Sequence, residues 1–175
     1  KGEAFMSGQP SDQPTAGRPD IPGYGLGDDS GLLPWSWAEQ RLSDAHTYWL
    51  STTRPDGRPH AMPVWGVWLD GRFYFSSGAS SRKARNLASQ PACVVSAGAG
   101  DVAVVLEGTA AREHDDALLE RAAAAYTTKY DWPLRVREGG VYDDSGNGGP
   151  MFAVQPSVVF GFGDDFATAT RWRFD

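Results

Sequence analysis

Hydroxyl and cationic side chains gather in one short segment, which reads Ser76-Ser77-Gly78-Ala79-Ser80-Ser81-Arg82-Lys83-Ala84-Arg85-Asn86-Leu87. The aromatic residues Phe73-Tyr74-Phe75 before it predict a strand, and the basic residues predict a helix that begins at once. Small hydroxyls, free backbone N–H groups and the positive end of a helix dipole would then meet at one place. This combination favours a phosphate, so the segment predicts an anion-binding site on an acidic chain.

A capped surface helix explains the same residues equally well. Serine is a common N-cap residue, and Ser80 would be the cap of this helix. Arg82, Lys83 and Arg85 would then simply be solvated. The residue types alone do not choose between the two interpretations, and the segment matches neither of the familiar glycine-rich nucleotide loops.

The other chemically active residues form no catalytic or metal-binding pattern. His46, His60 and His114 show neither the spacing of metal ligands nor a serine–histidine–acid arrangement. Cys93 is the only cysteine, and its place in an apolar run favours a buried, unreactive thiol. We therefore expect no metal site and no disulfide.

A period of two in the hydrophobic pattern predicts a mainly β chain. Six to seven antiparallel strands are expected, over residues 47–53, 60–69, 72–76, 92–97, 102–112, 152–163 and 166–174. Turns at Arg54–Gly57, Asp70–Gly71 and Gly98–Gly100 join several of them into hairpins. Strands with such short turns favour a small closed β-barrel, because closure removes the exposed edges of the sheet.

Peripheral helices are expected at the connections of this barrel, over about 37–45, over about 81–89 and from Asp115 or Asp116 onward. Ser36 and Glu39 have capping-box spacing at the start of the first helix. The apolar stripe of the last helix would consist of Leu118, Leu119, Ala122, Ala125 and Tyr126. After this helix in the sequence, we expect only a short helical turn after Pro133 and a glycine-rich acidic loop over Gly139–Pro150.

The chain is long enough for one domain with a proper core, which we place at residues 35–175. Residues 1–34 are rich in glycine and proline and have no hydrophobic period, so we interpret them as a flexible N-terminal arm. Residues 1–5, ahead of Met6, are interpreted as the remnant of an expression tag.

Composition excludes some classes of protein and favours others. A net charge of −6 argues against a general nucleic-acid-binding protein. No apolar run is long enough to span a bilayer, and the chain opens on no signal-peptide pattern, so we expect a soluble cytoplasmic protein without membrane partners. Seven Trp, six Tyr and eight Phe favour an obligate interface or a stacked flat ligand in addition to a core.

Several short motifs, taken in order, resemble the pyridoxamine 5′-phosphate oxidase-like split β-barrel superfamily. The motifs are the strand ending in Ser76-Ser77, then Ser81-Arg82-Lys83-Ala84, Asn86-Leu87 and Gln90-Pro91, together with the hairpin Asp56-Gly57-Arg58-Pro59-His60, Glu107-Gly108-Thr109-Ala110 and Thr170-Arg171-Trp172-Arg173-Phe174. The resemblance covers roughly residues 45–175. It is strongest to the actinobacterial branch of FMN-dependent and deazaflavin-dependent (coenzyme F420) oxidoreductases.

This resemblance implies a split-barrel homodimer that holds a flavin-type cofactor in clefts between its subunits. It implies that the phosphate or tail of the cofactor is bound by Ser76, Ser77, Ser81, Arg82, Lys83 and Asn86. It places the ring edge along the backbone of Met62, Pro63, Val64 and Trp65. It makes Arg171 and Trp172 of the closing strand candidate contacts to the partner subunit's cofactor. An alternative explanation, which we weigh equally, is that the closing strand simply buries its aromatic face in the core.

Pro63 agrees with this implication on separate grounds. Proline donates no N–H, so it fits poorly inside a central ladder and better on a strand whose free side faces a ligand. An ordinary edge strand or a bulge explains it equally well.

The function that follows is hydride transfer between coenzyme F420 or FMN and an unidentified small conjugated substrate. The missing acid–base group agrees with this, because the cofactor carries the chemistry in such proteins. Arg82, Lys83 and Arg85 favour the deazaflavin, whose anionic tail is long, without excluding FMN. The alternative is a non-catalytic flavin- or haem-type binding protein on the same barrel, and a third possibility is a structural dimer without a ligand.

Overall fold

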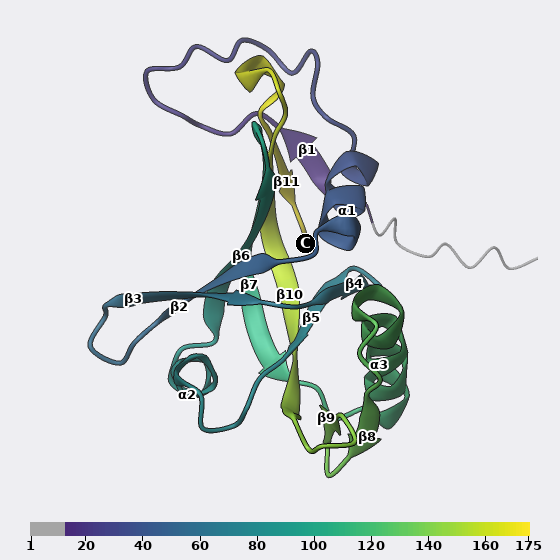
Figure 1. Ribbon diagram of the computed structural model, residues 1–175. Helices are drawn as coiled ribbons and strands as arrows, with labels where there is room; N and C mark the ends of the chain where they lie inside the picture. Colours follow the sequence, from purple (N-terminus) through teal and green to yellow (C-terminus); the bar gives the residue numbers. More distant parts are fainter. Residues whose placement is uncertain (1–12) are drawn as a thin grey trace, which may run out of the picture.

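The computed structural model describes residues 13–175, so the predicted tag remnant at 1–5 lies outside the described residues. Its strands are β1 (Thr15–Gly17), β2 (Tyr48–Thr53), β3 (Pro59–Val64), β4 (Val67–Leu69), β5 (Arg72–Ser76), β6 (Ala92–Ala99), β7 (Val102–Arg112), β8 (Arg135–Arg137), β9 (Gly140–Tyr142), β10 (Gly148–Phe162) and β11 (Thr170–Arg173) (Figure 1). Its helices are α1 (Trp35–Asp44), α2 (Arg82–Ser89), α3 (Asp116–Tyr130) and the 3-10 turn η1 (Phe166–Thr168). No helix among these residues has the length and apolar character needed to cross a lipid bilayer.

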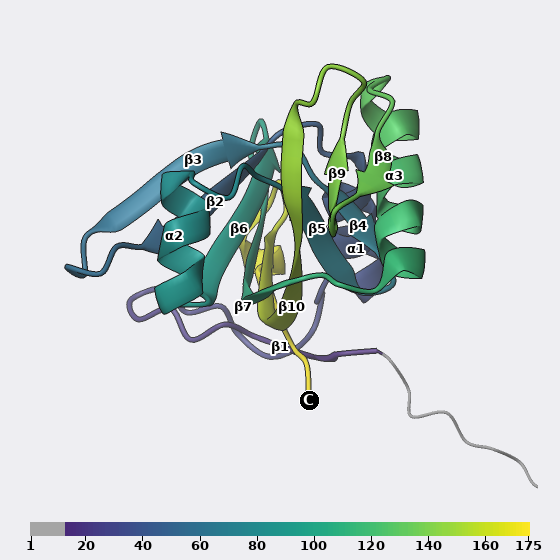
Figure 2. The ribbon, with the colours of Figure 1, turned by 90° about the horizontal axis from the view of Figure 1, so that it is seen from below.

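The long strand β10 organises the antiparallel sheet. It pairs along one edge with β7, in a sheet whose main order is β1-β11-β10-β7-β6-β2-β3. Its other edge pairs in turn with β9, β5 and β11. A register shift between Pro156 and Val158 lies where β10 passes from β5 to β11, and a proline, which donates no ladder hydrogen bond, suits such a bulge. The helices α2 and α3 flank β10 on opposite sides (Figure 2).

The predicted mainly β, antiparallel fold with peripheral helices is confirmed, but the sheet does not close into a complete barrel. Within residues 13–175, β3 pairs only with β2, and β4 pairs only with β5. The single strand expected over 60–69 is therefore wrong, because the chain breaks at Trp65-Gly66 and sends its two halves to different neighbours. The sheet is split there rather than continuous.

Gly66 is the residue that this break requires. A Cβ atom at this position would lie 2.1 Å from the ring of Phe73, which is fully buried. The peptide groups that the break leaves without a strand partner are bound by α3. Tyr130 accepts from the Gly66 N–H (2.9 Å) and donates to its carbonyl (2.8 Å), and Lys129 donates to the same carbonyl (3.1 Å).

Two boundary predictions at helix starts are wrong. The helix α1 begins at Trp35 behind Pro34, with no side-chain cap, so Ser36 lies inside the helix and forms no capping box with Glu39. The helix α2 is capped by Ser81 rather than Ser80, since the Ser81 hydroxyl accepts from the Ala84 N–H at 3.2 Å. The predicted cap of α3 at Asp115 is confirmed.

The region after α3 holds more β-structure than expected. The predicted helical turn and loop are replaced by the β8–β9 hairpin and the first residues of β10. Glycines permit this close pairing, because a Cβ on Gly148 would lie 2.0 Å from the Val141 carbonyl oxygen. The last predicted strand is shorter, since residues 166–168 form η1 and β11 starts at Thr170.

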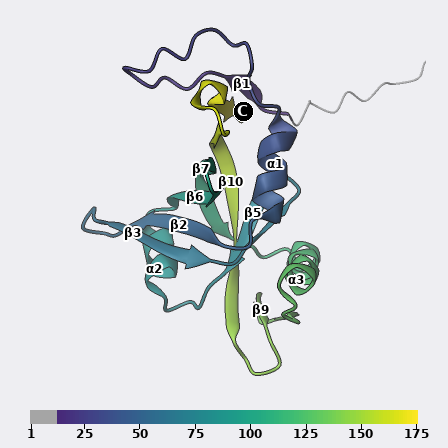
Figure 3. The same ribbon diagram turned by 45° about the horizontal axis from the view of Figure 1, so that its top comes forward.

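Residues 18–34 pass over the end of the sheet beside η1 (Figure 3). The strand β1 before them pairs with β11. Arg18 donates to the carbonyls of Asp28 (2.8 Å), Ala167 (2.6 Å) and Ala169 (2.9 Å), and so ties this segment to η1. The division of the chain into an arm and a barrel domain at residue 34 stays a prediction.

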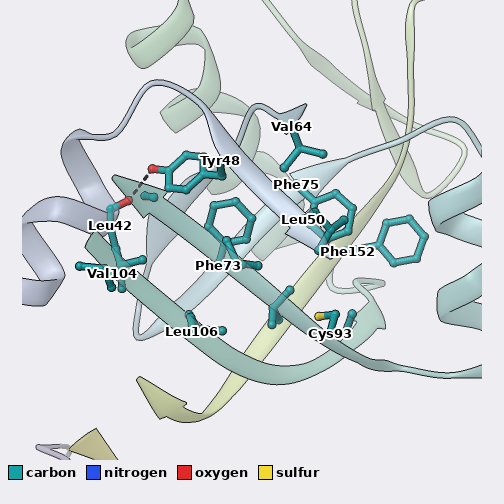
Figure 4. Close-up of a cluster of buried hydrophobic side chains, with 14 of the residues drawn as sticks. Leu42, Tyr48, Leu50, Val64, Phe73, Phe75, Cys93, Val104, Leu106 and Phe152 are labelled. Atoms are coloured by element: carbon teal, nitrogen blue, oxygen red, sulfur yellow. Dashed lines mark hydrogen bonds between the residues drawn. The ribbon is translucent and has the colours of Figure 1, made fainter. Parts of the chain in front are cut away.

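The hydrophobic core has two parts. The larger lies inside the split sheet and includes Tyr48, Leu50, Phe73, Phe75 and Leu106 (Figure 4). The smaller lies between α3 and β4, β5, β9 and β10, around Leu119, Tyr126, Val141 and Met151. Cys93 is buried in the larger part, and burial raises the pKa of its thiol to about 12, which confirms the predicted buried thiol and makes the reactive thiolate scarce.

Replacing Gly66 tests the break in the strand. Gly66→Ala forces a methyl group against the buried Phe73 ring, so it should lower the free energy of unfolding by about 1–3 kcal/mol. Denaturant unfolding measures this loss. Gly25→Ala is the matched control, because a Cβ there meets nothing within 4 Å. Equal stability of both variants would show that the break tolerates a side chain.

Lys129 makes the stability depend on pH. Burial lowers the pKa of Lys129 from 10.5 to about 8. The folded protein therefore binds fewer protons than the unfolded chain between these values, and its free energy of unfolding should rise with pH there. Relative to Lys129→Met, the rise should stay below about 1.4 kcal/mol per pH unit, because the side chain is only half-buried.

Urea unfolding of the wild type and Lys129→Met at several pH values between about 7 and 10 checks this rise. The difference between the two proteins is the quantity to follow, because Cys93 and the buried tyrosines titrate in both. A difference that does not change with pH would mean that Lys129 keeps its ordinary pKa.

Candidate functional site

A groove of about 340 Å³ lies between the ends of β3 and β5 and the start of α2. The predicted site residues that line it are Pro63, Val64, Trp65, Ser76, Ser77, Ser81 and Lys83. Gly78, Tyr126, Trp132 and Gly148 complete the lining. The structure thus brings together the predicted ring-edge strand and the predicted phosphate segment, which are separate in the sequence.

Serine hydroxyls and backbone N–H groups meet at the α2 end of this groove. The Ser77 and Ser81 hydroxyl oxygens lie 2.8 Å apart. The N–H groups of Ser81, Ala84 and Arg85 are all bonded locally. Among the described residues, no protein group accepts from the N–H of Arg82 or Lys83. These two N–H groups point from the positive end of the helix dipole and can bind an anion.

Lys83 adds a positive charge to the same wall. Its side chain is half-buried, and burial lowers the pKa of its ammonium group. In the part of the chain that the structure describes, no carboxylate lies within ion-pair distance of it. An anionic ligand in the groove would offset the cost of burying this charge.

The positive field extends from the groove to the β2–β3 hairpin. Burial first, and then the charges of Arg54, Arg82 and Lys83, lower the pKa of His60. Arg82 is exposed on the first turn of α2 and does not line the groove. The structure therefore separates the predicted cations into Lys83 at the groove and Arg82 beside it.

Tyr126 links the two strands at the groove. Its hydroxyl donates to the Trp65 carbonyl (2.6 Å) and accepts from the Ser76 N–H (3.3 Å). The Ser76 hydroxyl in turn donates to the Gly149 carbonyl at 3.2 Å. Tyr126 was predicted only as part of an apolar stripe, and Trp132 was not predicted at all, because neither residue type nor spacing marks an aromatic side chain as part of a site.

The remaining predicted site residues lie elsewhere. Asn86 is buried and donates to the Thr52 hydroxyl at 3.0 Å, so it fixes α2 against β2. Met62 is exposed on β3, opposite Leu50. Arg171 is half-buried on β11, where it pairs with Phe160.

Trp172 is fully buried in the larger core. Its ring packs edge-on against Trp35, with centroids 5.6 Å apart. The register that places it opposite Val159, which is also fully buried, turns its side chain to the core face of the sheet. The structure therefore matches the alternative of a closing strand with a buried aromatic face, and it does not bring Trp172 to the groove.

Comparisons with solved structures agree with this fold. A protein named F420 reductase shares 22% identity with a TM-score of 0.51 and covers 69% of this chain and 94% of its own. An FAD-binding protein from Mesorhizobium loti shares 17% (TM-score 0.56; 81% and 96% covered). A heme-binding protein from Mycobacterium smegmatis shares 20% (TM-score 0.60; 81% and 59% covered). At these identities the likenesses show the split-barrel fold alone.

A search of curated proteins found no match. The family model described as pyridoxamine 5′-phosphate oxidase matches residues 37–151. This match spans more than half of the chain and contains the ends of β3 and β5 and the start of α2. The chain therefore belongs to the pyridoxamine 5′-phosphate oxidase family.

Proposed function

We propose that the groove binds a flavin-type cofactor and that the protein is an oxidoreductase, which transfers hydride between this cofactor and a small conjugated substrate. One observation carries the proposal: the hydroxyls of Ser77 and Ser81 and the ammonium group of Lys83 line one groove at the start of α2. Family membership supports a cofactor of this type.

The α2 end of the groove fits the phosphate of such a cofactor. A phosphate presents several strong acceptor oxygens. Because the Ser77 and Ser81 hydroxyls bond to each other, one of their O–H groups remains to donate. The N–H groups of Arg82 and Lys83, which have no acceptor among the described residues, and one cation add to it. Hydrogen bonds that involve ionised groups are about twice as strong as neutral ones. Ser76, whose N–H and hydroxyl are both bound within the protein, would position this wall instead of contacting the phosphate.

The β3 wall fits the edge of a flat ring. In residues 13–175, the second edge of β3 pairs with no strand, so its backbone groups near Pro63 and Val64 are open to the groove. Ring carbonyls and N–H groups can pair with such an edge as a neighbouring strand would. Tyr126 holds the Trp65 carbonyl and the Ser76 N–H, and so fixes the distance between this wall and the β5 wall.

The cofactor, when bound, would supply the hydride chemistry. The chain would bind it, orient its ring and exclude water. None of the groove-lining residues is a histidine or a carboxylate, so this lining supplies orientation and hydrogen bonds rather than an acid–base pair.

Coenzyme F420 is the cofactor that the charges favour. Arg54, His60 and Arg82 lie beyond Lys83 and share its positive field. A long anionic tail would use several of these groups, whereas the single phosphate of FMN would need only the wall at the start of α2. We therefore propose coenzyme F420, with FMN as the other candidate.

A non-catalytic ligand-binding protein is the second candidate function. Proteins of this fold include one named a heme-binding protein and one named a heme storage protein. Turnover separates the two functions, because a binding protein would not speed the reduction or reoxidation of the cofactor above the rate in solution.

We also propose that the protein is a homodimer. Trp49, which is 54% exposed, lies beside Pro63 across the β2–β3 ladder, on the same outer face as Ala61. Exposed apolar patches of this kind are typical of protein interfaces. Pro63 also lines the groove, so a second copy packed on this face would add a wall to the cofactor site.

Removing the two cations tests the phosphate site. Arg82→Ala combined with Lys83→Ala should raise the Kd of the cofactor at least about 10- to 10²-fold, because the charge-assisted contact of Lys83 contributes about 1.5–3 kcal/mol and Arg82 adds the field of a second charge beside the groove. Side-by-side fluorescence titrations with coenzyme F420 and FMN measure this change and identify the cofactor. Binding of neither one by the wild type would reject the proposed function.

Arg85→Ala is the matched control for these titrations. Arg85 is on the same helix but is exposed and does not line the groove. If Arg85→Ala weakens binding as much as Lys83→Ala alone, the effect comes from the general field of the helix. Unchanged affinity in the double variant would reject the site.

Trp49→Glu tests the dimer. A carboxylate in the middle of an apolar interface should dissociate it, and sedimentation velocity should then show a monomer. Tyr24→Glu is the control, because Tyr24 is 62% exposed and its ring contacts Phe166 of η1. A wild-type protein that sediments as a monomer would contradict the proposed dimer.

A further inference from the structure

Three aromatic side chains form an exposed strip at the end of β10 that lies away from the groove. β10 begins at Gly148, which lines the groove, and ends at Phe162. The Phe162 ring stacks on Phe166 of η1, with centroids 6.0 Å apart, and the Phe166 ring contacts Tyr24, with centroids 5.0 Å apart. Tyr24 is 62% exposed and Phe166 is 41% exposed. Exposed aromatic rings gathered in this way are typical of interaction surfaces, and we call these three side chains the aromatic strip.

A single guanidinium group holds the support of the aromatic strip together. Arg18 donates to the Asp28 and Ser30 carbonyls of its own segment. It also donates to the Ala167 and Ala169 carbonyls at η1. The segment that carries the tyrosine of the strip is thereby tied to the turn that carries its central phenylalanine. Because these bonds already hold the two segments, the binding of a partner would cost little ordering of the backbone.

Carboxylates flank the aromatic strip in both segments. The exposed acidic residues within 18–34 and 163–169 are Asp20, Asp28, Asp29, Asp164 and Asp165. In the part of the chain that the structure describes, none of these carboxylates forms an ion pair with a Lys or Arg side chain. Arg18 is the only basic residue of the two segments, so together they carry a net negative charge.

Charge and aromatic surface together favour a cationic partner. The face of an aromatic ring attracts a cation, and an arginine can stack on the ring while its N–H groups donate to carboxylates. The same carboxylates would repel a second copy of this surface, an anionic lipid headgroup or a nucleic-acid phosphate. The chemistry of the surface therefore fits a basic stretch of polypeptide.

We propose that the aromatic strip and its carboxylates bind an arginine-containing segment of another protein. The guanidinium groups of this segment would lie on the exposed rings of Tyr24 and Phe166 and donate to the carboxylates beside them. Because the strip and the groove lie at opposite ends of β10, this inference does not depend on the proposed function. Binding should weaken as salt is added, since exposed charges carry much of the attraction.

A short fluorescein-labelled peptide in which arginine alternates with leucine is the probe for this surface. Fluorescence anisotropy at low salt should show saturable binding to the wild type. Tyr24→Ser combined with Phe166→Ser should raise the Kd about 10-fold, because both exposed ring contacts are lost. Asp29→Asn combined with Asp164→Asn should raise it about 3- to 10-fold, because two attracting charges are removed. A peptide with glutamate in place of arginine should not bind.

Glu120→Gln combined with Glu138→Gln is the matched control, because it removes the same charge from exposed positions on α3 and between β8 and β9. An equal Kd for the wild type and the double serine variant would overturn the proposal. An equal loss in the glutamine control would also overturn it, by assigning binding to the net charge of the chain. A change in the sedimentation of the double serine variant would assign the strip to a contact between copies instead. Tyr24→Ser alone serves the comparison if the double variant does not fold.

Discussion

The break at Trp65-Gly66 is the constraint on which the rest of the structure depends. It ends β3 and directs β4 to β5, and this leaves one edge of β3 without a paired strand among the described residues. Gly66 is buried, so the peptide groups that the break leaves without a strand partner would be costly if they stayed unpaired. Tyr126, Lys129 and Tyr130 bind them from a single face of α3. The groove exists because one helix supplies the hydrogen bonds that a neighbouring strand would otherwise supply.

At the start of α2, the arrangement of charges favours the binding of an anion at some cost in stability. Lys83 is half-buried without a carboxylate partner among the described residues, and His60 shares its positive surroundings. A protein selected only for stability would place an acidic residue at this helix N-terminus. Keeping the positive charges uncompensated lowers stability slightly and leaves their attraction available to an anionic ligand.

Local patterns allowed the prediction of most elements and of the cluster of hydroxyls and a cation at the start of α2. Ser77, Ser81 and Lys83 are close in sequence, so the helix start itself determines their meeting. The break at Gly66 was missed because its reason is a distant ring, that of Phe73. The hairpin after α3 was missed because glycines conceal the alternation of its strands. Tyr126 and Trp132 join the site only through tertiary packing, and no residue spacing predicts that.

The pairing of β10 with β9, β5 and β11 along one edge has a consequence for how the protein folds. The residues that line the groove on β3, β5 and α2 are all synthesised before β10. Within residues 13–175, the only other strand paired with β5 is the short β4. Pairings between strands so distant in sequence are slow to form, because loop closure must come first. A chain emerging from the ribosome would hold these side chains without their final geometry until β10 arrives, so the proposed cofactor would be bound only at the last stage of folding.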